Sequence, residues 1–192
     1  MGDITNNFSY YEFRPKSASK SWMPSSEYRK ILIYQLATNL QVIRSKLPAG
    51  CYMKITSGVR TLADYERLKK AGYKPSKTSD HNCGLAIPLS PSSSRFKKYG
   101  STYNFAVGAA DVVPVGLTVW GLFALSVDFV KKKKCNFGQV IYEKNPKTGA
   151  EWVHYGNSLK GIFSKKIIDF VGRKQFMKSL DGGRTYSVVN KV

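Results

Sequence analysis

The chain is poor in acidic residues and in histidine. Only 12 Asp and Glu stand against 31 Lys and Arg, which gives a formal net charge of +19, and only two histidines, His81 and His154, occur in 192 residues. Such a positive field attracts polyanions, namely nucleic acid, anionic lipid headgroups or an anionic cell wall. The three cysteines, Cys51, Cys83 and Cys135, lack the spacing of a disulfide framework. They indicate reduced thiols in a protein made in the cytoplasm.

The chain also lacks an apolar run long enough for a transmembrane helix. The best candidate, residues 112–127 ("VVPVGLTVWGLFALSV"), contains Pro114 and is shorter than the roughly 20 apolar residues that a span needs. A strand end followed by a buried helix is the better interpretation, with Lys131 to Lys134 solvated at the negative end of the helix dipole. The start, "MGDITNNFSYYEF", has no basic region followed by an apolar core, so we expect no secretory signal peptide.

The spacing of apolar residues along the chain predicts an α+β protein. Helical spacing of leucine and isoleucine, after a serine that suits an N-cap, predicts a long amphipathic helix over residues 26–47. Shorter helices are expected at residues 62–72 and 116–130. Strands are expected at residues 51–58, 109–115, 137–143 and 151–156, with two more around "DGG" at 181–183. We therefore expect one domain over residues 1–192, with helices packed on a small antiparallel sheet.

The scarce histidines and one acid suggest a metal site. A catalytic zinc typically takes three protein ligands and leaves one position for water. His81 lies in a small-residue loop, "SDHNCG", His154 lies in the strand-like "EWVHYG", and Asp111 opens an apolar strand, where an unpaired carboxylate would be costly. Glu151 is a candidate proton carrier. It precedes His154 by three residues, so a bend or bulge would be needed to bring both side chains to one face.

Each of these residues also has a structural interpretation. Two scattered histidines can be core residues with one hydrogen bond each, Asp111 can pair with a lysine, and Glu151 can be a solvated turn acid. The residue spacing alone leaves both interpretations open.

The order of the motifs resembles the M15 family of zinc peptidases, which share the hedgehog/D,D-peptidase fold. The resemblance runs from about Phe8 to Tyr155. It rests on "ITSGVRT", "SDHNCG", "GAADVV", "FGQVIYE" and "EWVHYG". The matching positions are Ser57, Gly58, Arg60, Ser79, His81, Gly84, Glu151, Trp152, Val153 and His154.

One departure concerns the acidic ligand. In the family the aspartate follows the first histidine by seven residues, but here that position is Pro88, which cannot bind zinc. A second Ala-x-Asp ends at Asp111. Either residues 85–107 are an insertion, forming a loop or small subdomain over the cleft, or the site has lost its acid. We favour the insertion. Residues 157–192 would then be a C-terminal strand extension.

The resemblance implies one zinc ion held by His81, Asp111 and His154. It implies that Glu151 takes a proton from water and passes it to the leaving amine, while Arg60 binds the substrate carbonyl or carboxylate and stabilises the oxyanion. Ser79 either holds the substrate or caps its loop. Glu143, at the end of "FGQVIYE", is the alternative base or a hydrogen-bond acceptor behind a ligand.

The family's substrates are the stem peptides of bacterial peptidoglycan. The resemblance therefore implies a metallopeptidase of the D,D-carboxypeptidase or of the L-Ala-D-Glu or D,D-endopeptidase type. A small, basic chain without a leader looks most like a phage-encoded murein hydrolase, such as an endolysin. It would be made in the bacterial cytoplasm and would act on the wall after release or as a virion component. The alternatives are a basic nucleic-acid-binding protein and a zinc-free relative that only binds the cell wall.

Overall fold

The computed structural model describes residues 2–73, 75–77, 79–83, 87–88, 90–92, 94, 97, 102–103, 107–157 and 175–190. The described helices are α1 (Glu27–Arg44), α2 (Leu62–Lys70) and α4 (Val119–Lys131), with 3-10 turns η1 (Tyr10–Phe13) and η2 (Asp80–Asn82). The described strands are β1 (Tyr52–Ser57), β2 (Ile87–Pro88), β3 (Thr102–Tyr103), β4 (Ala109–Val115), β5 (Phe137–Lys144), β6 (Glu151–Asn157), β7 (Gln175–Ser179) and β8 (Ser187–Val188).

Six of the described strands form one sheet in the order β1-β4-β6-β5-β7-β8. The neighbouring strands are antiparallel except for β5 and β7, which run parallel. The expected α+β class is thus confirmed, but the expectation of a purely antiparallel sheet is wrong. Strand β5 has its hairpin partner β6 on one side and β7 on the other, and β7 runs in the same direction as β5.

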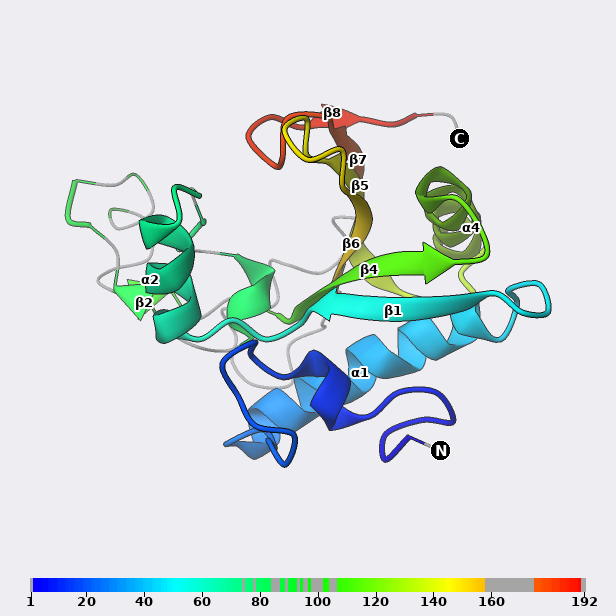
Figure 1. Ribbon diagram of the computed structural model, residues 1–192, viewed down its shortest axis with the longest axis horizontal. Coiled ribbons are helices and arrows are strands. Elements are labelled where there is room, and N and C mark those ends of the chain that lie inside the picture. The colour runs from blue at the N-terminus through cyan, green and yellow to red at the C-terminus, as the bar shows by residue number, and fades with distance from the viewer. Residues whose placement is uncertain are drawn as a thin grey trace.

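Two helices cover one face of this sheet. Helix α1 begins at the N-cap Ser26, whose hydroxyl accepts the backbone N–H of Arg29, and it ends at Arg44. Helices α1 and α4 both pack against β6 (Figure 1). The hydroxyl groups of Ser126 on α4 and Tyr155 on β6 share a hydrogen bond of 2.7 Å inside the core. Because α1 and α4 cover one face of the sheet, a functional site on these strands has to lie on the opposite face.

The β5–β6 hairpin shows how the sequence separates the two faces. Its turn closes where the backbone N–H of Asn145 donates to the carbonyl of Ala150 at 2.8 Å. Along β6, Val153 and Tyr155 are fully buried in the core. Because side chains alternate along a strand, Trp152 and His154 project from the opposite face, away from α1 and α4.

The segment considered as a membrane span is divided between β4 and α4. Residues 112–115 belong to the strand and residues 119–127 to the helix. Among the described residues, no helix has both the length and the apolar character needed to cross a bilayer.

Most of the expected insertion at residues 85–107 lies outside the described residues, as does Gly84. Its described part includes the short antiparallel pair of β2 and β3. In the expected C-terminal extension, residues 175–190 are described, and β7 and β8 add two strands to the main sheet.

Candidate metal centre

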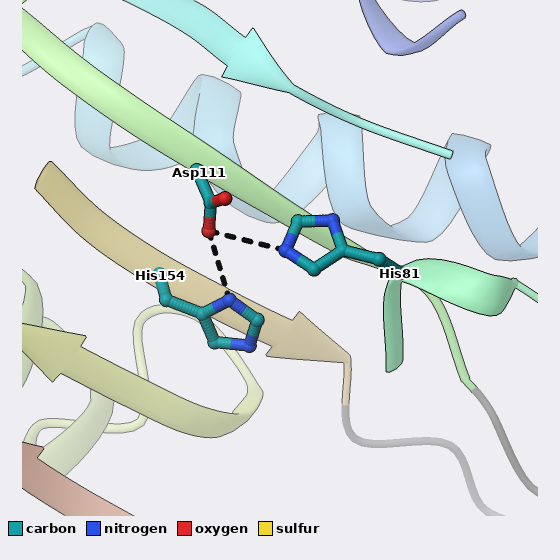
Figure 2. Close-up of side chains that lie close together, drawn as sticks. All are labelled: His81, Asp111 and His154. Carbon is teal, nitrogen blue, oxygen red and sulfur yellow. Dashed lines mark hydrogen bonds and ion pairs between the residues drawn. The ribbon is translucent and has the colours of Figure 1, made fainter. Parts of the chain in front are cut away.

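Strand pairing places two of the expected ligands opposite each other. Asp111 on β4 and His154 on β6 are direct partners in the antiparallel register. Their side chains therefore leave the same face of the sheet, the face that α1 and α4 do not cover. The third expected ligand, His81, arrives from the turn η2 and meets them from the side (Figure 2).

The three side chains converge on one carboxylate oxygen. Asp111 Oδ1 lies 2.9 Å from His154 Nδ1 and 3.1 Å from His81 Nε2, as the dashed lines in Figure 2 show. The two imidazole rings are 5.0 Å apart between their centroids. One ligand atom from each residue lies within 4.8 Å of the others, so the group could hold a metal ion. Both histidines are buried, at 3% and 9% exposed.

The backbone around His81 fixes which of its ring nitrogens faces the cluster. His81 Nδ1 lies 2.7 Å from the carbonyl oxygen of Gly58, which can only accept, so Nδ1 carries the proton. The backbone N–H of Arg60 donates to the carbonyl of His81 at 2.7 Å. The segment 58–60 and the turn η2 thus hold each other through reciprocal hydrogen bonds.

Gly58 has a steric reason to be glycine. A Cβ atom there would lie 2.4 Å from the carbonyl oxygen of Phe13, closer than real Cβ contacts. The backbone N–H of Val59 donates to that same carbonyl at 2.7 Å. Only a residue without a side chain lets η1 approach the segment that orients His81.

The contact between His81 and Asp111 is better explained by a bound cation than by a hydrogen bond between the two side chains. With Nδ1 protonated, a neutral His81 presents the lone pair of Nε2 to a carboxylate oxygen, so two acceptors face each other at 3.1 Å. Burial lowers the pKa of His81, although the Asp111 carboxylate opposes that shift, and this favours the neutral ring. A bound metal ion would satisfy both acceptors. Two imidazole nitrogens and one carboxylate are also a donor set typical of catalytic zinc.

The two other ligands are electrostatically coupled. Burial alone would lower the pKa of His154, but the hydrogen bond to Asp111 and its charge outweigh burial and raise that pKa. Burial alone would raise the pKa of Asp111, but the hydrogen bond from His154 and the charge of that imidazole hold it well below its usual range. Asp111 is therefore a carboxylate at neutral pH, as a metal ligand must be.

The three side chains line a pocket of about 430 Å³. The expected residues Arg60 and Ser79 line it together with the three ligands. Arg60 Nη1 lies 3.4 Å from Ser79 Oγ, and burial, the largest cause, lowers the pKa of its guanidinium. In the part of the chain that the structure describes, no carboxylate forms an ion pair with Arg60.

The structure does not bring Glu151 to this pocket. Its Oε1 accepts from Lys144 Nζ at 2.9 Å, and the hydrogen bonds from Lys144 and then Tyr142 lower its pKa. The bulge that Glu151 would need is absent, because β5 and β6 stay in register from Gly156 back to Glu151. With an odd separation on a regular strand, Glu151 and His154 project to opposite faces.

Glu143 lies in the pocket instead. It pairs with Trp152 across the hairpin, two residues from the Ile141–His154 pair, so it shares the face of His154. Its side chain is only 8% exposed, and burial, the largest cause, raises its pKa. The hydroxyl of Tyr186 donates to Glu143 Oε1 at 3.3 Å.

Some pocket residues had no signal in the sequence. Arg14 comes from the N-terminal segment, Asp64 from α2, and Tyr186 from the loop after β7. Comparison with protein-family models, with curated proteins and with solved structures finds no match for this chain.

Proposed function

We propose that this protein is a zinc-dependent peptidase that cleaves the stem peptides of bacterial peptidoglycan. The observation that carries the proposal is the buried His81, Asp111 and His154 group, which lines a pocket together with Glu143 and Arg60. Metallopeptidases combine these parts: a metal with an open position, a carboxylate base and a cationic group for the oxyanion.

His81 Nε2, His154 Nδ1 and a carboxylate oxygen of Asp111 would hold the ion. Zinc at this position would act as a Lewis acid and lower the pKa of a coordinated water to about 7. The carbonyl of Gly58 fixes the tautomer of His81 and keeps its ring oriented. Hydrogen bonds of this kind behind a ligand support metal affinity.

Glu143, rather than Glu151, would be the general base. Burial, the largest cause, raises its pKa, which would make its carboxylate a stronger base than that of an ordinary glutamate. The carboxylate would accept a proton from the attacking water and return it to the leaving amine. Glu151 is the weaker candidate, since its carboxylate is paired with Lys144 on the other face of the strand.

Arg60 would bind the scissile carbonyl as negative charge develops on its oxygen. Its planar guanidinium can offer two parallel donors, which suits a carbonyl oxygen or a carboxylate. Ser79 contacts Arg60 and would help to orient its guanidinium.

The substrate assignment rests on the order of the motifs and on charge. The five quoted segments follow the order of the M15 peptidases, whose substrates are stem peptides, and the net charge of +19 would hold the protein on an anionic cell wall. We propose a phage-encoded murein hydrolase that reaches the wall after release or within a virion.

The test is metal analysis followed by digestion. Protein purified without chelator should contain one zinc ion per chain and should release stem-peptide fragments from purified peptidoglycan, identified by mass spectrometry. A protein without stoichiometric divalent metal would overturn the proposal. Metal-free protein that stays on immobilised DNA at about 0.2 M salt would instead indicate a nucleic-acid-binding protein. Metal-free protein that binds only cell wall would indicate a binding module.

A further inference from the structure

The loop after β7 begins beside Glu143. Strand β7 runs parallel to β5, and the last pair in their register is Glu143 with Ser179. The C-terminal ends of parallel strands lie at the same end of a sheet. The chain that leaves β7 therefore turns close to Glu143, which lies near the C-terminal end of β5. The loop at residues 180–186 does so before β8 returns along β7.

Asp181 gives this loop a defined structure. Its Oδ1 accepts hydrogen bonds from Ser179 Oγ, from the backbone N–H of Arg184 and from that of Thr185, at 2.8 to 3.0 Å. Its Oδ2 accepts from Thr185 Oγ1 at 2.6 Å. One carboxylate thus organises the turn that leads to Tyr186.

Backbone hydrogen bonds attach the same loop to the sheet. The N–H of Gly182 donates to the carbonyl of Lys144, the residue after Glu143, at 2.9 Å. The N–H of Gly183 donates to Ser179 Oγ at 2.9 Å. A Cβ atom on Gly183 would lie 3.0 Å from the hydroxyl of Tyr186 and 3.8 Å from Glu143 Oε2. The loop therefore lies directly against the carboxylate.

We propose that Tyr186 is a positioning residue for Glu143, so that the C-terminal hairpin formed by β7, β8 and their loop is part of the catalytic centre. The hydroxyl of Tyr186 donates to Oε1 of Glu143 at 3.3 Å, so that Oε2 would be the oxygen that accepts the proton of the attacking water. Hydrogen bonds to a charged acceptor are stronger than neutral ones, so one phenol can fix the orientation of a buried carboxylate. This inference rests on the proposed role of Glu143 as the base.

The kinetic test uses Tyr186→Phe, which removes only the hydroxyl. The kcat for stem-peptide hydrolysis should fall on the order of 10-fold, while KM and the zinc content stay unchanged. The matched control is Tyr34→Phe, because Tyr34 is an exposed tyrosine on α1 outside the pocket. An unchanged kcat, or a loss that appears only in KM, would overturn the proposal.

A second test needs no activity. The unfolding of the metal-free protein by urea is measured for Tyr186→Phe, Glu143→Ala and the double variant, which forms a double-mutant cycle. The proposal expects the two substitutions to be non-additive, with Tyr186→Phe losing its effect once the carboxylate is gone. Additive effects would overturn it whatever the kinetics show.

The two tests together separate this inference from the proposed function. If Glu143→Ala keeps full activity while the cycle is non-additive, the contact exists but Glu143 is not the base, and the role of Tyr186 in catalysis fails with it. If Glu143→Ala is inactive and Tyr186→Phe is fully active, only the assignment of Tyr186 fails.

Discussion

Asp111 and His154 face each other directly across β4 and β6, and one oxygen of Asp111 meets both histidines. Because Asp111 and His154 are partners in the register of β4 and β6, the backbone hydrogen bonds of these two strands hold their positions. The sheet therefore orients two of the three ligands before any metal binds, and only His81 depends on a turn.

Zinc should stabilise the folded protein through this pair. At a free zinc concentration about 100 times the Kd, binding only to the folded state adds about 2.7 kcal/mol to the free energy of unfolding. Chelation should reverse this gain, as measured by the thermal midpoint with and without chelator. The variant Asp111→Ala should lose both the metal and the zinc-dependent shift. Retention of stoichiometric zinc by Asp111→Ala would show that another residue is the acidic ligand.

Gly58→Ala should weaken the metal site although residue 58 is not a ligand. The new Cβ would meet the carbonyl of Phe13, so either η1 or the segment that holds His81 has to move. We expect lower stability and reduced zinc affinity, measured by competition with a chromogenic chelator.

The control for that substitution is Gly149→Ala. Gly149 has a positive φ of 72° but no atom within 4 Å of an added Cβ, so the backbone cost of about 1–2 kcal/mol is its main effect. Zinc affinity should stay at the wild-type level. Equal loss of zinc in both variants would mean that Gly58 acts through general stability.

Local patterns made most of the fold predictable. Helical spacing and a serine N-cap predicted α1, and the segment that ends at Gly72 was expected to be the short helix α2. The Pro114-containing β4 was predicted over residues 109–115, the range it occupies. The three ligand candidates could be proposed because the chain has only two histidines and one acid at the start of an apolar strand. These helices, strands and candidate ligands can be recognised from short stretches of sequence, because they depend on residues that are close together in the chain.

Long-range pairing was harder to predict. The parallel contact between β5 and β7 joins segments separated by β6, and no short pattern specifies it. The choice between Glu143 and Glu151 depends on cross-strand register, which the turn after β5 sets. Tyr186 reaches the site only through the parallel strand, so its role could not be inferred before the fold was known.

Arg60→Lys should lower the rate without changing the metal content. An ammonium group cannot offer the two parallel donors of a guanidinium, so the developing oxyanion would lose part of its stabilisation. We expect a fall in kcat on the order of 100-fold. The control is Arg44→Lys in the last turn of α1, which should keep full activity. If Arg60→Lys also keeps full activity, Arg60 does not contact the reacting group.

The sharpest prediction compares two glutamates on the same hairpin. Glu143→Gln should abolish hydrolysis and keep zinc, because Gln has nearly the same shape but cannot accept the proton from water. Glu151→Gln should keep both activity and zinc, because it removes only the contacts with Lys144 and Tyr142 on the other face.

Both variants are measured side by side for kcat and for zinc per chain. The resemblance to M15 peptidases favours the carboxylate three residues before His154, whereas the register of β5 and β6 favours the one opposite Trp152. An inactive Glu151→Gln beside an active Glu143→Gln would mean that β6 shifts or bulges when substrate or metal binds. Loss of zinc in Glu143→Gln with activity restored by added zinc would instead make Glu143 a hydrogen-bond acceptor behind a ligand, because such residues act mainly through metal affinity.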